Sequence, residues 1–309
     1  MNILVVGCGA MGAIFAGLLS KSGNTVTVLV RSQETAGLIN NNGIRVEGYS
    51  GDTLQKIKAI TKEDSCSDFD LIILAVKATQ IETAAMDVKK FVGNKSLILT
   101  IQNGLGSSDI VASILGDERL MVGIAGGFGA ELKGPCHTFH NNMQIVRIGA
   151  YSTLAYAEVN KITSLWLDAG FKAESSRNIE VMLWEKLFCN VAYSALCAIS
   201  GMRTGQVMND PDIEPISRAA AQEAWEVAKA SGLKLAVTDP IAHVEAFGLG
   251  MPGSRPSLLQ DVEAGRQSEI DFINGAIVKE AKRIGMEAPV NTFLTSLVRA
   301  KERKNRGIC

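Results

Sequence analysis

The chain has 309 residues, which is long enough for two domains that each bury a sizeable core. Its 31 lysines and arginines nearly balance its 32 aspartates and glutamates, and this balance argues against a surface for nucleic acid. Charged residues, asparagine or glycine interrupt every apolar run, and no basic leader precedes the first one. We therefore expect no membrane span and no signal peptide.

The first part of the chain alternates short apolar runs with helical patterns, which is typical of a parallel α/β sheet. We predict strands over residues 3–6, 25–30, 43–47, 71–76, 96–100 and 119–125. Helices are predicted over residues 11–21, 34–41, 80–91 and 106–115. An antiparallel pair over 136–140 and 144–148, a helix over 155–169 and a strand over 171–174 complete this part.

A Gly-x-Gly-x-x-Gly segment follows the first strand directly and leads into the first helix. Gly7 allows a tight turn, Gly9 lets the backbone approach a pyrophosphate, and Gly12 lets the helix pack closely on the strand. The helix also directs its positive end and its free N–H groups at the phosphates. The context of strand, turn and helix predicts a dinucleotide site made by Gly7, Cys8, Gly9, Ala10, Met11 and Gly12.

The second predicted strand ends in Arg31, where an NAD-binding fold usually carries aspartate or glutamate. A carboxylate at this position would accept the ribose hydroxyls and repel a 2′-phosphate, whereas an arginine fork pairs with that phosphate. The alternative is a solvated charge at a strand end. We favour the phosphate contact and predict that the cofactor is NADPH.

Polar side chains follow two further strands, at the edge of the sheet where ligands bind. Lys77 either meets a phosphate or the ribose of the cofactor, or only reaches solvent, and the residues leave this open. Asn103 precedes Gly104, so it is either a simple turn residue or a ligand contact near the expected nicotinamide. We favour the ligand contact for Asn103.

From about residue 177 onward the pattern is helical almost to the end of the chain. We predict helices over residues 181–199, 213–231, 239–246, 258–265, 268–284 and 290–301. The fold class is therefore α/β, with an N-terminal Rossmann-type doubly wound sheet followed by an all-helical C-terminal domain. We place the nucleotide domain at 1–177 and the helical substrate domain at 178–309, with a ligand expected between them.

One helix of the second half carries an unusual polar stripe. Lys186, Asn190 and Ser194 are spaced four residues apart, so they share one face of a largely apolar helix. A partly buried lysine there would have its pKa lowered toward a value suited to proton donation. From the residues alone, an ordinary amphipathic helix is the favoured alternative. Glu269, near a predicted helix start, is by itself an ordinary capping residue.

Cysteine and histidine usage excludes other kinds of site. The six cysteines form no Cys-x-x-Cys pair, and Cys8, Cys189 and Cys197 are interpreted as small core residues, so we expect a reducing cytoplasm. The three histidines lack metal-ligand spacing, and we expect no metal site. The remaining cysteines are Cys66, Cys136 and Cys309.

Taken in order, these segments resemble the ketopantoate reductase (2-dehydropantoate 2-reductase) family over the whole chain. The resemblance is carried by residues 7–12, Arg31, Lys77, Gln102-Asn103-Gly104, Trp184-Glu185-Lys186-Leu187, Asn190, Ser257, Ser268-Glu269-Ile270-Asp271, Ile273-Asn274-Gly275 and Ala288-Pro289-Val290-Asn291. No single segment is specific, but their order and spacing together are.

The resemblance implies hydride transfer from NADPH to the ketone of 2-dehydropantoate, a small 2-oxo acid, giving (R)-pantoate for pantothenate and coenzyme A synthesis. It implies that Lys186 is the general acid and that Glu269 lies by both substrate and cofactor as a second catalytic residue. It assigns substrate contacts to Asn103 and Asn190, which also hold the nicotinamide side, and it assigns the substrate carboxylate to Ser257. This is coherent, because ketone reduction builds negative charge on oxygen and a preorganised cation stabilises it.

Two positions depart from the family pattern and leave the substrate open. Ser194 stands where a second substrate-binding asparagine is typical, and Thr204 replaces another asparagine. The short Ser194 side chain would reach a substrate only through water, so another 2-oxo acid or an imine is an alternative substrate. A non-catalytic NADPH-binding sensor is a further hypothesis, which the retention of Lys186 and Glu269 argues against. A homodimer is compatible with the sequence, which cannot separate a dimerising helix face from core.

Overall fold

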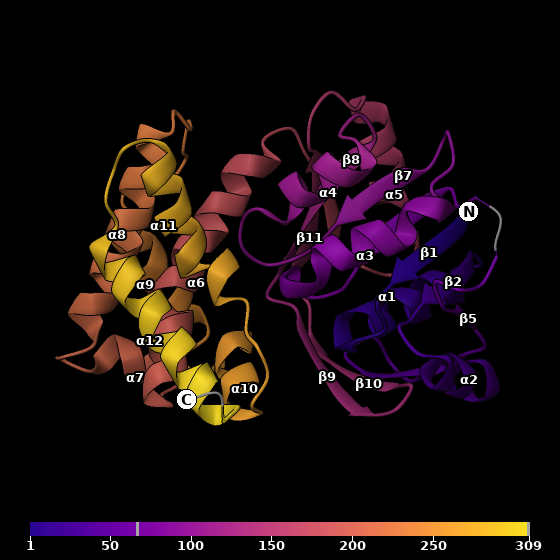
Figure 1. The fold of residues 1–309 in the computed structure, drawn as a ribbon, viewed down its shortest axis with the longest axis horizontal. Helices are drawn as coiled ribbons and strands as arrows, with labels where there is room; N and C mark the ends of the chain where they lie inside the picture. Colours follow the sequence, from indigo (N-terminus) through magenta and orange to yellow (C-terminus); the bar gives the residue numbers. More distant parts are fainter. Residues whose placement is uncertain (66–67, 308–309) are drawn as a thin grey trace. The chain divides into compact units, whose positions relative to one another are not determined.

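The computed structural model describes residues 1–65 and 68–307, and the chain divides into two compact units. The first unit consists of Met1–Gln102 with Ser107–Ile179, and the second of Asn103–Gly106 with Glu180–Cys309 (Figure 1). The segment Asn103–Gly106 thus packs with the second unit, although the chain on both sides of it belongs to the first. Cys66 and Cys309 lie outside the described residues.

The first unit is built on an eight-stranded sheet with the order β12-β11-β8-β7-β6-β1-β2-β5. The strands are β1 (Asn2–Val6), β2 (Thr25–Leu29), β5 (Lys58–Ile60), β6 (Leu71–Leu74), β7 (Leu97–Thr100), β8 (Leu120–Gly126), β11 (Ile145–Ala150) and β12 (Ala173–Ser176). Neighbouring strands run parallel from β5 to β8, and β11 is antiparallel to β8. The prediction of a Rossmann-type sheet is confirmed.

Helices cover both faces of this sheet, which is why its central strands are continuous apolar runs. The helices of this unit are α1 (Ala10–Lys21), α2 (Gln33–Asn42), α3 (Ile81–Val88), α4 (Ser107–Leu115) and α5 (Tyr156–Asp168). Alternate residues of β1 face opposite sides: Ile3 joins the apolar cluster of α1 and α5, and Leu4 joins that of α3 and α4. Phe15 of α1 and Trp166 of α5 pack edge to face with their ring centroids 4.9 Å apart.

A second sheet has the order β4-β3-β10-β9 and consists of β3 (Ile44–Gly48), β4 (Thr53–Gln55), β9 (Gly129–Gly134) and β10 (His137–Asn142). The predicted antiparallel pair over 136–140 and 144–148 is wrong. β10 pairs with β9 and β3, whereas β11 pairs with β8 and β12. Thr138 and His140 are buried where β10 packs beside α1, while Val146 of β11 is buried in the main sheet. The two strands are therefore buried in different sheets, although only two residues separate them in the sequence.

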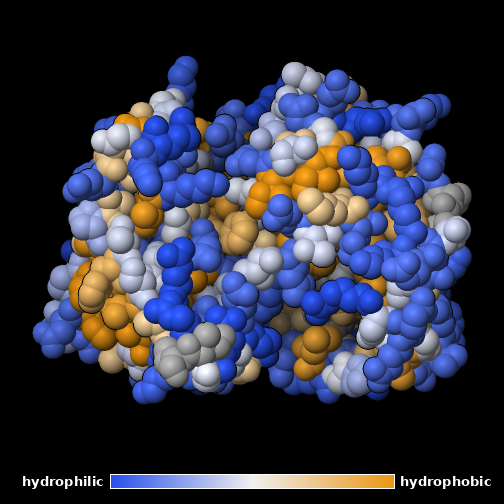
Figure 2. All heavy atoms as spheres, in the orientation of Figure 1, coloured by the Kyte–Doolittle hydropathy of each residue, from blue (hydrophilic) through white to orange (hydrophobic). Residues whose placement is uncertain are grey.

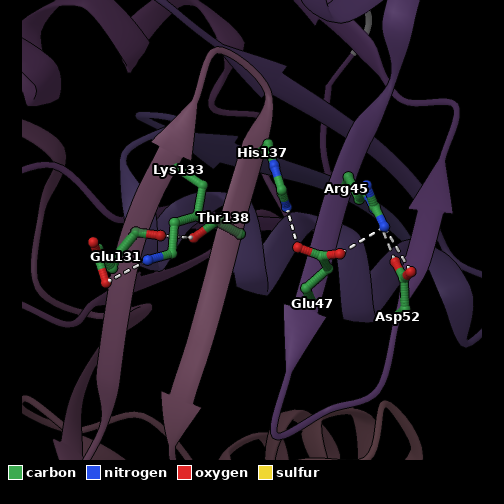
Figure 3. A network of polar contacts seen from close by, with 7 residues as sticks. All are labelled: Arg45, Glu47, Asp52, Glu131, Lys133, His137 and Thr138. Carbon is green, nitrogen blue, oxygen red and sulfur yellow. Dashed lines mark hydrogen bonds and ion pairs between the residues drawn. The ribbon is translucent and has the colours of Figure 1, made fainter.

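Arg45, Glu47 and His137 form part of a polar network on the other face of the second sheet (Figure 3). The guanidinium of Arg45 lies 2.6 Å from the Glu47 carboxylate and 2.8 Å from that of Asp52, and His137 Nε2 lies 2.5 Å from Glu47. Half-exposed pairs of this kind contribute little to stability. They indicate a solvated outer face.

The second unit is helical throughout the part that the structure describes. It contains α6 (Ile179–Ser200), α7 (Thr204–Asn209), α8 (Glu214–Ala230), α9 (Pro240–Gly250), α10 (Ser257–Glu263), the 3₁₀ turn η3 (Ile270–Phe272), α11 (Asn274–Arg283) and α12 (Pro289–Asn305). α6 lies in the middle of the apolar cluster, with Leu187, Phe188 and Val191 buried. The prediction of one helix over 268–284 is wrong, because η3 precedes α11 and Ile273, with ψ −99°, interrupts the helix.

The surface fits the balanced charge of the sequence. Hydrophilic residues predominate on the face shown in Figure 2, and apolar atoms show between them. Large exposed apolar side chains such as Leu249 and Phe293 do occur, as on most proteins. Within residues 1–65 and 68–307, no helix has the length and apolar character that crossing a membrane requires.

Candidate active site

The turn between β1 and α1 has the geometry that dinucleotide binding requires. Gly7 has φ +92°, and a Cβ there would lie 2.6 Å from the Val76 side chain. A Cβ on Gly12 would overlap the carbonyl oxygen of Gly7. Gly9, by contrast, is exposed at the N-cap of α1, and a Cβ there would meet no atom within 4 Å. The tight glycines shape the turn, and Gly9 leaves open space beside the N–H groups of α1, as a phosphate-binding turn of this fold requires.

The other residues of the glycine turn are partly buried and supported from the second sheet. Thr138 Oγ1 lies 3.2 Å from the carbonyl oxygen of Ala10, which ties β10 to the start of α1. Cys8 and Met11 pack against the apolar cluster of the first unit. Burial raises the pKa of Cys8 to about 12, because it disfavours the thiolate, so Cys8 is a packing residue rather than a nucleophile.

Arg31 follows β2 and is exposed. The Gly7 N–H donates to the carbonyl of Leu29 at 2.9 Å, so the end of β2 lies beside the glycine turn. Ser32 caps α2 by accepting the N–H of Thr35 at 3.1 Å. Arg31 itself forms no hydrogen bond or ion pair with any of the described residues. Its guanidinium is therefore available to a ligand at the strand end where this fold contacts the adenosine ribose.

Lys77 and Gln102 follow neighbouring strands of the main sheet. Lys77 is half-buried at the start of the short 3₁₀ turn η1 (Ala78–Gln80). Gln102 Nε2 donates to the carbonyls of Leu74 at 2.5 Å and Val76 at 3.0 Å, which ties the carboxyl ends of β6 and β7 together. The sequence offered no role for this buried amide, because its partners become neighbours only in the folded sheet.

In the second unit, Lys186 on α6 donates a hydrogen bond from Nζ to Asn103 Oδ1 at 2.8 Å. Burial lowers the pKa of Lys186 to about 8, because desolvation disfavours the ammonium, and the charges of Glu269 and Cys189 oppose this change. Lys186 is therefore mostly protonated at neutral pH and yields its proton more readily than an exposed lysine.

Asn103 reaches Lys186 because its segment lies against residue 272. The Leu105 N–H donates to the carbonyl of Phe272 at 2.8 Å. Gly104 has φ +83°, and a Cβ there would overlap the same carbonyl oxygen. Only glycine fits this close approach, so Gly104 determines where Asn103 lies.

Glu269 directly precedes η3 and is 8 % exposed. Its side chain does not cap that turn. Its negative charge instead acts on Lys186. The structure thus brings together Lys186, Asn103 and Glu269, three residues that are far apart in the sequence.

The remaining predicted substrate residues lie on α6 and α10. Asn190 is half-buried one turn beyond Lys186, and Ser194 is 5 % exposed one turn further on. Ser257 is exposed at the first residue of α10. Thr204 is buried, with its hydroxyl 3.4 Å from the carbonyl of Ser254, so the chain itself engages this hydroxyl.

A Rossmann-type unit with an open glycine turn, joined to a helical unit that carries a lysine of lowered pKa, defines a class of nucleotide-dependent oxidoreductases. The protein-family model described as ketopantoate reductase PanE/ApbA matches residues 3–153. The family model described as ketopantoate reductase PanE/ApbA C terminal matches residues 178–302. The chain therefore belongs to the ketopantoate reductase family.

Relatives and solved structures agree with this assignment. A 2-dehydropantoate 2-reductase of Pyrococcus horikoshii is 30% identical over 307 residues, covering 99% of both chains. One of Archaeoglobus fulgidus is 29% identical over 301 residues, covering 97% of this chain and 98% of that one. A ketopantoate reductase structure from Ralstonia eutropha has a TM-score of 0.89 at 30% identity, over 99% of this chain and 100% of that one. D-mandelate dehydrogenase with NADH and anilino(oxo)acetate has a TM-score of 0.91 at 28% identity, with the same coverage.

Proposed function

We propose that the protein is an NADPH-dependent reductase that converts 2-dehydropantoate to (R)-pantoate, the step that supplies pantothenate and coenzyme A synthesis. The observation that carries the proposal is the hydrogen bond from Lys186 to Asn103, with Glu269 acting on the same ammonium. The family models cover residues 3–153 and 178–302, and the resemblance described above assigns the active site to these three residues. We assign nucleotide binding to residues 1–177, and substrate binding and catalysis to residues 178–309.

The exposed guanidinium of Arg31 supports the choice of NADPH. It stands where a carboxylate would select NADH, and no described residue neutralises it. The D-mandelate dehydrogenase structures contain NADH, so the family fold by itself does not select the phosphate. The open backbone at Gly9 fits a pyrophosphate in either cofactor.

The chemistry assigned to the chain is proton transfer to the carbonyl oxygen. The dihydronicotinamide, when bound, supplies the hydride. Lys186 Nζ donates the proton as negative charge develops on the oxygen, and Asn103 Oδ1 orients the ammonium by accepting one of its hydrogens. Glu269 keeps the ammonium protonated before the transfer, since its charge opposes the effect of burial. We assign Asn190 and Ser257 to binding of the 2-oxo acid substrate.

A second candidate is the reduction of a 2-oxo acid that lacks the hydroxyl of 2-dehydropantoate. Its support is the pair of short side chains: Ser194 is buried, and the hydroxyl of Thr204 is engaged by Ser254. Amide groups that could hold a substrate hydroxyl are thus missing at two positions. A branched or aromatic oxo acid would need no such partner.

Steady-state kinetics with a panel of oxo acids tests the proposal. The purified protein is assayed with 2-dehydropantoate, 3-methyl-2-oxobutanoate and phenylglyoxylate, each with NADPH and NADH. We expect the highest kcat/KM with 2-dehydropantoate and NADPH. Negligible turnover of 2-dehydropantoate with rapid turnover of another acid would replace the first candidate by the second. Nucleotide binding without any turnover would favour the sensor.

A further inference from the structure

The C-terminal helix α12 presents Arg299 and Glu302 on one face, since residues three apart on a helix are neighbours. Both side chains contact residues 268–272, the segment that carries Glu269 and the turn η3. The helix and the segment belong to the second unit. The segment is therefore attached to α12 at two points.

Glu302 makes the buried one of these contacts. Its Oε1 accepts the Ser268 N–H at 2.9 Å, and both residues are buried, Glu302 at 4 % and Ser268 at 1 % exposure. Ser268 Oγ in turn lies 3.3 Å from the N–H of Ile270. A buried carboxylate costs free energy that an apolar side chain of similar size would not. Glu302 therefore stabilises a particular backbone position, directly beside Glu269, rather than the core in general.

Arg299 makes the second contact at the surface. Its Nη2 and Nε lie 2.6 and 2.7 Å from Oδ1 of Asp271. The two side chains are 50% and 44% exposed, so this ion pair contributes little free energy. Arg299 is therefore a secondary support to Glu302.

The far end of the same turn supports the proton donor from another side. The carbonyl of Phe272 accepts the Leu105 N–H at 2.8 Å and leaves no room for a side chain at Gly104. The position of the turn thus decides where Asn103 meets Lys186. A displacement of residues 268–272 would move both Glu269 and Asn103 relative to Lys186.

We infer that Glu302 is a positioning residue for the proton donor, holding Glu269 and the Asn103 segment against Lys186 through the Ser268 backbone. Its part in catalysis rests on the proposed function, because it requires Lys186 to be the general acid. Asn103, Glu269 and Cys189 are among the groups that act on the Lys186 ammonium, and Glu302 acts through the first two.

The test compares Glu302→Ala with Glu302→Gln and with the exposed control Arg303→Ala. Glutamine keeps an oxygen that can accept the Ser268 N–H, whereas alanine does not. The first readout needs no substrate: the titration of Lys186 is followed by NMR of protein labelled with ε-¹³C-lysine, and its signal is assigned by its loss in Lys186→Arg.

In the wild type the midpoint is expected near the Lys186 pKa of about 8. In Glu302→Ala the midpoint of the Lys186 titration moves to lower pH, because the Glu269 carboxylate moves away and stabilises the Lys186 ammonium less. Glu302→Gln and Arg303→Ala keep the wild-type midpoint. An unchanged midpoint in Glu302→Ala overturns the inference. A rise overturns it as well, because it would mean that water entry rather than loss of Glu269 controls the site.

A fourth variant separates positioning from loss of stability. Val298→Ala removes two methyl groups from a fully buried residue of the same helix. We expect it to lower the Tm without moving the Lys186 midpoint, and a shift equal to that of Glu302→Ala would show a general effect and refute positioning.

The second readout is the pH profile of kcat. Its alkaline limb should move in Glu302→Ala in the same direction as the NMR midpoint, while KM for NADPH stays within about twofold of wild type. A fall in kcat by the same factor at every pH, with no shift of the alkaline limb, would contradict the positioning role of Glu302. If the wild type reduces no 2-oxo acid, the proposed function fails, and the NMR titration still decides the role of Glu302.

Discussion

Replacing Gly104 by alanine adds one methyl group where the segment that carries Asn103 approaches the Phe272 carbonyl. The new Cβ would overlap the Phe272 carbonyl oxygen and lie 2.6 Å from its carbon, where ordinary carbon contacts need about 3.5 Å. The segment must therefore move by about 1 Å. The positive φ of +83° adds about 1–2 kcal/mol of strain for a residue with a Cβ.

A displacement of about 1 Å at a group that orients a proton donor, the role that we propose for Asn103, costs about a hundredfold in rate. We therefore expect Gly104→Ala to lower kcat about a hundredfold, because Asn103 no longer meets Lys186 at 2.8 Å. KM for NADPH should change much less than kcat, because the glycine turn and Arg31, which we assign to the pyrophosphate and the 2′-phosphate, are unaltered. The assays are steady-state kinetics and thermal unfolding.

Gly106 offers a matched control in the same segment. Its φ is +93°, so alanine there carries the same backbone strain, but a Cβ would meet no atom within 4 Å. Gly106→Ala should therefore lower the Tm by the backbone strain alone, which is less than in Gly104→Ala, and retain most of the activity. Equal kcat values for the two variants would refute the argument that the contact of Gly104 with Phe272 places Asn103.

Three further predictions concern the proton donor and the cofactor. Lys186→Ala should lower kcat at least about a hundredfold with NADPH binding nearly intact, as measured by kinetics and fluorescence titration, and an unchanged kcat would remove Lys186 as the general acid. Arg31→Ala should raise KM for NADPH about tenfold, or about 1.4 kcal/mol, with little effect on NADH, and an equal effect on both cofactors would exclude Arg31 as the reader of the 2′-phosphate. Reduction should slow above about pH 8, where Lys186 loses its proton, and a pH-rate profile that stays flat to pH 10 would contradict this. Because the folded pKa lies below the ordinary 10.5, the unfolded chain binds more protons between these values, so the contribution of Lys186 to the free energy of unfolding rises with pH in that window.

The sequence by itself determined the features that depend on local sterics and periodicity. The glycine turn can be recognised in the sequence because glycine is sterically required at Gly7 and Gly12. A Cβ at either position would clash with the turn itself or with the end of the adjacent strand. The strand and helix patterns were sufficient for the Rossmann-type unit and the helical unit, since burial on sheet faces and helix stripes has fixed periods. Arg31 could be singled out because its place follows directly from the end of β2.

The sequence patterns failed where distant segments compete for the same residues. β10 and β11 are separated by Met143 and Gln144, yet they join different sheets, because β10 buries Thr138 and His140 beside α1, whereas β11 packs against α5. The predicted helix over residues 268–284 is likewise interrupted, since the Ser268 N–H is held by Glu302 of α12 and Ile273 departs from helical geometry. Pairing over long sequence distances overrides local propensity in both cases.

Only the tertiary structure decided the chemistry of the polar stripe. From the residues alone, the favoured interpretation was that Lys186 lies on the outer face of an ordinary amphipathic helix. Its pKa of about 8 arises from burial, and its partners Asn103 and Glu269 come from segments about 80 residues away on either side. Desolvation and charge act through space, so the lowered pKa of Lys186 belongs to the packed site and not to the helix that carries the lysine.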